Sequence, residues 1–140
     1  MYATKADMLA RYADADLRQL TDCDEPYQGA IVDAVLDQAL ADASEEMDAY
    51  LRPRFRLPLS AAPDILKRLA CRLAYFNLHR NLPPEEVSKA RDQALQQLAQ
   101  IRDRKLDIGI AEDVPAAQPA SGPVYAGGPR VFTRDTLEGV

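Results

Sequence analysis

The amino-acid sequence predicts an all-α fold, a small bundle of four main helices with an extended C-terminal arm. Three observations predict it. Much of the 47% hydrophobic share is Ala and Leu, while aromatic residues reach only 6% and Trp is absent, a composition that favours helices over sheets. Apolar residues recur at steps of three and four in long segments, as on one face of a helix. Prolines gather between these segments and after residue 110, where they stop helices.

The first helix is expected to begin at TKAD, residues 4–7. Thr4 can cap the free amides of the first turn, and Asp7 can reach back to the cap or meet the positive end of the helix dipole. The sequence also allows a short second helix from Asp14 or Asp16, closing before a polar loop at residues 21–26.

A long central helix is predicted over residues 28–51, because one apolar stripe runs through the whole segment at helical spacing. The stripe comprises Ile31, Val35, Leu36, Ala39, Leu40, Ala43, Met47, Tyr50 and Leu51. The opposite, solvated face carries Asp33, Asp37, Asp42, Glu45 and Asp48.

Two more helices are predicted over residues 63–79 and 85–105. Pro63 suits a first helical turn, and the helix that follows is apolar over so wide an arc that we expect it to be the most buried, with Cys71 a buried thiol. The last helix has acids at its start and bases at its end, as the helix dipole favours.

The C-terminal part of the chain has a different composition. Four of the ten prolines and three of the six glycines lie in residues 111–130, which is typical of an extended linker. We therefore divide the chain into a helical domain, residues 1–110, and a Pro/Gly-rich arm, residues 111–140. The arm carries a small apolar motif near its end, with Val131, Phe132 and Leu137 apolar, and we expect Arg130, Val131 and Phe132 to dock on a partner.

The charges are unevenly distributed. Residues 1–50 hold twelve acidic and three basic residues, a net charge of −9, whereas residues 51–80 hold seven basic residues and one acidic residue, a net charge of +6. Such a division suits a subunit whose acidic face meets the basic face of its neighbour. The alternative is that the two groups pair within one chain.

The segment LRPRFRLPL, residues 51–59, is the most informative motif. In an extended chain alternate residues share a face, so Arg52, Arg54 and Arg56 would point one way and Phe55 would anchor the other side. Three guanidinium groups can clamp carboxylates or phosphates. Three partners remain open: a neighbouring subunit, nearby DNA, or the chain's own Asp42, Glu45, Glu46 or Asp48.

No catalytic or metal-binding motif is apparent. The single histidine, His79, has no nucleophile or set of co-ligands at a suitable spacing, and the carboxylate pairs lie on the solvated helix face. We expect a protein that is not an enzyme and needs no cofactor or metal. The N-terminus has no secretory signal pattern, and no apolar run is long enough to span a membrane.

Several segments together resemble the small Mu-like phage and prophage proteins encoded among head and tail morphogenesis genes. They are MYAT at residues 1–4 with Leu9 and Tyr12, LTD at 20–22, ALADAS at 39–44, DAYL at 48–51, RFRLPL at 54–59, RLAC at 68–71, Tyr75, and GGPRVF at 127–132. The resemblance implies a head–tail connector, a head-completion or adaptor subunit in a ring beneath the portal, commonly twelve-fold. It supplies no catalytic residues.

The leading hypothesis is therefore a structural virion protein, made in the host bacterial cytoplasm, that forms a ring between portal and tail-side phage proteins. Its subunit contacts would come from Asp42, Glu45, Asp48, the 52–56 segment and the arm. One alternative is a small helical adaptor or regulator that binds one partner protein. Another is a DNA-binding module, which the net charge of −5 disfavours.

Overall fold

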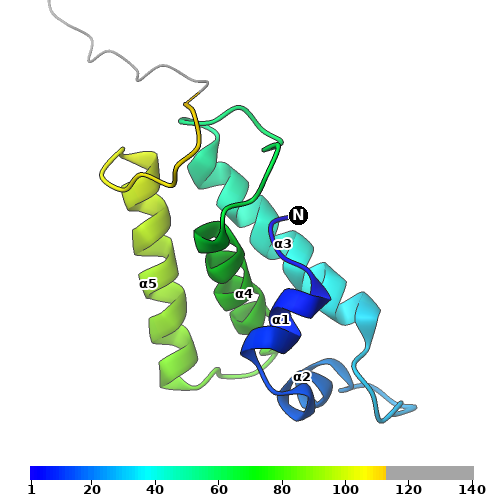
Figure 1. Cartoon of the computed structure of the whole chain (residues 1–140). Coiled ribbons are helices and arrows are strands. Elements are labelled where there is room, and N and C mark those ends of the chain that lie inside the picture. The colour runs from blue at the N-terminus through cyan, green and yellow to red at the C-terminus, as the bar shows by residue number, and fades with distance from the viewer. Residues whose placement is uncertain (113–140) are drawn as a thin grey trace, which may run out of the picture.

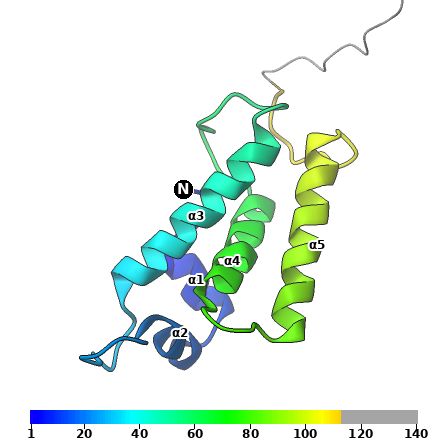
Figure 2. The ribbon, with the colours of Figure 1, turned by 180° about the vertical axis from the view of Figure 1, so that it is seen from behind.

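The computed structural model describes residues 1–112, and these form five helices with no strand among them. The helices are α1 (Lys5–Arg11), α2 (Asp14–Thr21), α3 (Asp33–Leu51), α4 (Asp64–Leu78) and α5 (Glu85–Arg102). The predicted all-α bundle is confirmed, with five helices rather than four main ones because the short α2 is a separate element. Both views show α4 between α3 and α5, with α1 crossing at one side (Figures 1 and 2).

The start of α1 is the predicted capping box. Thr4 Oγ1 accepts from the Asp7 amide at 3.4 Å, and the Asp7 carboxylate accepts from the Thr4 amide at 2.9 Å. This reciprocal bonding satisfies two amides that the first turn of a helix leaves free. Helix α1 therefore begins where the sequence predicts.

Helix α3 begins at Asp33, five residues later than predicted. The Asp22 carboxylate accepts the amides of Gln28 and Gly29 at 2.8–3.0 Å, and Gly29 has a φ of 66°, which side-chain-bearing residues rarely adopt. The Val32 amide donates to Thr21 Oγ1 at 3.0 Å. A loop bound to the end of α2 thus replaces the first turn that the apolar pattern predicts.

The core lies where the inward faces of α3, α4 and α5 meet. Helix α4 buries seven of its fifteen residues, against three of eighteen in α5, which confirms the prediction that it is the most buried. Each large side chain removed from water contributes roughly 1.5–3 kcal/mol. The largest fully buried side chains are Met8, Leu17, Leu36, Leu40, Met47, Leu51, Phe55, Leu66, Leu69, Leu73, Leu98 and Ile101.

Candidate functional site

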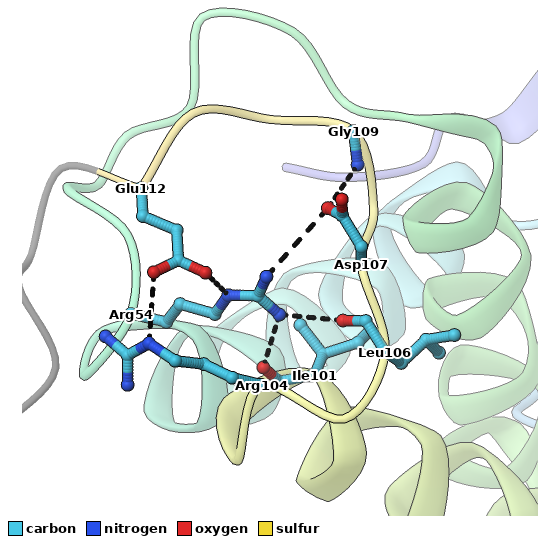
Figure 3. Close-up of polar contacts among 7 residues, drawn as sticks. All are labelled: Arg54, Ile101, Arg104, Leu106, Asp107, Gly109 and Glu112. Carbon is cyan, nitrogen blue, oxygen red and sulfur yellow. Dashed lines mark hydrogen bonds and ion pairs between the residues drawn. The ribbon is translucent and has the colours of Figure 1, made fainter.

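Arg54 is a buried hub where three parts of the chain meet (Figure 3). Only 4% of it is exposed. Its Nη1 donates to the carbonyls of Ile101 and Leu106, each at 2.7 Å, and its Nε donates to Glu112 Oε1 at 2.7 Å. Nη2 lies 3.9 Å from Asp107 Oδ1.

The local backbone explains how Arg54 reaches this position. After α3 ends at Leu51, the amides of Arg54 and Phe55 both bond to the Leu51 carbonyl, at 3.0 and 2.8 Å. The chain therefore turns inward, and only 1% of Phe55 remains exposed. At the other side, the last carbonyls of α5 have no partner within their own helix, and a guanidinium is a favourable cap for that negative end.

Glu112 completes the hub. Its second oxygen, Oε2, accepts from Arg104 Nε at 3.0 Å. The hydrogen bonds from Arg104 and Arg54, together with the two positive charges, hold the pKa of Glu112 below its usual range. The hub thereby ties the end of the helical domain to the loop that follows α3.

The prediction that Arg52, Arg54 and Arg56 share one face is wrong. The segment opens with a turn rather than an extended chain, so Arg54 is buried while Arg52 and Arg56 are exposed. The alternative partners on α3 are also wrong for Arg54, since its carboxylate partners are Glu112 and Asp107. Phe55 is an internal anchor, as its apolar character suggested.

Part of the charge division is neutralised within the chain. Lys5 Nζ lies 2.5 Å from Asp33 Oδ1, Arg80 Nη1 lies 3.0 Å from Asp24 Oδ1, and Arg91 Nη2 lies 2.9 Å from Glu46 Oε1. These three pairs join helices or loops far apart in the sequence. Of these three pairs, only Arg80–Asp24 joins the basic group in residues 51–80 to the acidic group in residues 1–50. The intramolecular alternative is thus correct for that pair alone.

Three of the acidic residues that remain form the acidic face, defined as Asp37, Asp42 and Glu45 on the outer side of α3. All three are exposed, and none forms an ion pair with another residue in the range 1–112. Asp42 accepts only a hydrogen bond from Gln38 Nε2, at 2.7 Å. The predicted contact residue Asp48 is different, because it accepts a hydrogen bond from the Tyr2 hydroxyl.

A second set of charges, the basic face, consists of Arg11, Arg68 and Arg72 on α1 and α4. Beside it the rings of Tyr12 and Tyr75 stack with their centroids 4.0 Å apart. Burial raises the pKa of Tyr12 to about 12. Sequence reasoning counted these arginines but missed the face, although the spacing of Arg68, Arg72 and Tyr75 places them on one side of α4.

Within residues 1–112, no cluster of three or more metal-ligating side chains occurs. No helix in the same range has the length and apolar content that a bilayer crossing requires. The predicted contact residues Arg130, Val131 and Phe132, and nearly all of the predicted arm, lie outside the described residues.

Comparison with known proteins identifies the family. The family model described as Bacteriophage Mu, Gp36 matches residues 2–126. The chain is 42% identical over 118 residues to gene product J of Escherichia phage Mu, covering 84% of this chain and 82% of that protein. It is 25% identical over 139 residues to the Mu-like prophage FluMu protein gp36 of Haemophilus influenzae, covering 99% and 97%. The chain, whose described residues form a helical bundle with an acidic and a basic face, belongs to the Gp36 family of Mu-like phage proteins.

Proposed function

We propose that the chain is a structural virion protein, a head–tail connector subunit that forms a ring beneath the portal. It would act through contacts with copies of itself and with portal and tail-side proteins, without catalysis. The observation that carries the proposal is the pair of charged faces. A stable single chain gains little from leaving three carboxylates and three guanidinium groups without opposite charges, whereas charge complementarity between subunits is a common means of aligning them.

The family and the fold support this role. Gene product J of phage Mu and this chain align over more than four fifths of both. The Arg54 hub joins Ile101, Leu106 and Glu112 to the loop after α3. The last described residue, Glu112, therefore has a defined position on the bundle.

The test is removal of the gene from the phage that encodes it. We expect filled heads and separate tails in electron micrographs of the lysate, and joined particles when the gene is supplied in trans. An antibody or gold label on the chain should mark the joint between head and tail. Infectious particles that lack the chain would overturn the proposal, and a chain found with one non-virion partner would favour the adaptor alternative.

A further inference from the structure

The basic face lies along the outward ridge of α4. Arg68 and Arg72 are one helical turn apart and Tyr75 is the next residue along the same ridge, because a helix turns 100° per residue. Arg11 joins them from the end of α1. None of the three arginines makes an ion pair within residues 1–112, and the Arg11 guanidinium donates to the Asp7 carbonyl instead, at 3.1 Å.

Two hollows make this face suitable for a protruding partner. A groove of about 370 Å³ runs between the end of α1, α4 and the start of α5. Its walls include the apolar or aromatic residues Tyr12, Tyr75 and Val87, and two residues of opposite charge, Arg72 and Glu86, also line it. A second hollow of about 280 Å³ is lined by Arg11 and Arg68 together with Asp64 and Ile65. A partner that enters the two hollows meets three arginines and two carboxylates, an excess of one positive charge.

The acidic face offers the complementary shape and charge. Helix α3 is a straight rod at the edge of the bundle in both views (Figures 1 and 2). Its outer side presents Asp37, Asp42 and Glu45, with the exposed Gln38 between Asp37 and Asp42 and the small residues Ala34 and Ala49 before and after the three acids. The exposed side of α3 therefore carries three negative charges within three helical turns.

The two faces lie on different helices. The buried residues Ala70 and Ala74 lie on the side of α4 opposite to Arg68 and Arg72. Asp42 of the acidic face lies near the other end of α4, where it lines a hollow with Asn77 and Arg80. No ion pair joins the acidic face to the basic face within residues 1–112, so a contact between two chains leaves a free acidic face at one end and a free basic face at the other.

We propose that the acidic face of one copy docks on the basic face of the next, with the outer side of α3 in the groove beside Tyr12 and Tyr75. Such head-to-tail contacts repeat, and they close into a ring when the rotation between copies allows it. The inference rests on the proposed connector function and adds to it which surfaces form the subunit interface.

The test uses two charge-reversal variants of the full chain, Arg68→Glu/Arg72→Glu and Asp42→Arg/Glu45→Arg. Each should fold like the wild type by circular dichroism but associate at least about tenfold more weakly in sedimentation equilibrium, since like charges then meet. Mixing the two variants should restore association, because every contact again joins opposite charges. A chain with all four substitutions should associate with itself but not with the wild type.

Controls separate this interface from other effects. Reversals at exposed sites outside both faces, Arg18→Glu and Asp92→Arg, should leave association unchanged. Wild-type association should weaken as salt is raised, since exposed charges are screened. Loss of association in one variant with no rescue in the mixture overturns the proposal, and so does a wild type that stays monomeric at high concentration and low salt.

Two further outcomes separate the proposed interface from the connector function and from DNA binding. If both variants assemble normally and the chain still labels the head–tail joint, the interface is wrong while the connector function stands. If Arg68→Glu/Arg72→Glu abolishes binding to a labelled DNA duplex and the mixture does not restore association, the basic face is a DNA contact rather than a subunit contact, which also overturns the proposal.

Discussion

Arg54 and Glu112 are joined by a 2.7 Å hydrogen bond between Nε and Oε1, although they lie 58 positions apart in the sequence. The bond holds the last described residue of the chain, just beyond the predicted helical domain, against the loop that follows α3. With the carbonyls of Ile101 and Leu106, the Glu112 carboxylate occupies most of the donors of a guanidinium that is almost entirely buried. The domain boundary is thus stabilised by one side chain.

Arg54→Met is expected to lower the free energy of unfolding by roughly 2–4 kcal/mol, because the Leu106 carbonyl loses its side-chain donor while the Ile101 carbonyl and the Glu112 carboxylate each keep only their bond from Arg104. Urea denaturation measures the change. Arg54→Lys should recover only part of the loss, since an ammonium cannot reproduce the planar fork. The exposed neighbour provides the control: Arg52→Met should stay within about 0.5 kcal/mol of the wild type. Equal effects at Arg52 and Arg54 would contradict the hub.

Tyr12 and Tyr75 are expected to couple energetically. Their rings are parallel within 1° and 4.0 Å apart, and such pairs contribute about 0.5–1.5 kcal/mol beyond the area that they bury. A double-mutant cycle with Tyr12→Leu and Tyr75→Leu measures this coupling. A coupling energy near zero would show that the two rings pack independently.

The stability of the chain should depend on Asp7 in a defined range of pH. The hydrogen bond from the Thr4 amide lowers the pKa of Asp7 from 3.8, so the stabilisation is complete above the ordinary pKa and is lost as pH falls through the lowered pKa. Asp7→Asn should therefore be less stable than the wild type near pH 7, and the difference should shrink in strong acid. Urea denaturation at a series of pH values measures it.

The control for Asp7→Asn is Asp92→Asn. Asp92 is exposed in the middle of α5, and its carboxylate makes no hydrogen bond or ion pair within residues 1–112. This variant should follow the wild type over the same pH range. A difference between Asp7→Asn and the wild type that grows in acid would contradict the sign of the linkage.

The two cysteines should differ in reactivity. Cys71 is buried, and burial raises the pKa of its thiol to about 11, whereas Cys23 is exposed. Because the thiolate is the reactive form, a thiol reagent near pH 8 should modify one thiol per folded chain and two in denaturant. Cys23→Ser should abolish the fast reaction in the folded chain. Fast modification of two thiols in the native wild type would show that Cys71 is accessible.

Local patterns were sufficient to predict the helices. The spacing of apolar residues identifies α3, α4 and α5 because a helix places every third and fourth residue on one face, and the Thr4–Asp7 capping box is complete within four residues. The buried state of Cys71 follows from the same apolar arc. The family resemblance that these segments indicated is confirmed by the comparison with phage Mu and prophage proteins.

Contacts between distant residues were decided only by the tertiary structure. The sequence alone determined which segments are helical and where charge accumulates, since both depend on near neighbours. It could not show that Arg54 turns inward, because the carbonyls and the carboxylate that stabilise it lie 47–58 positions away. Nor could it separate the charges that pair within the chain from those of the acidic and basic faces. That division depends on how the core packs, because the packing decides which sides of α3 and α4 face outward.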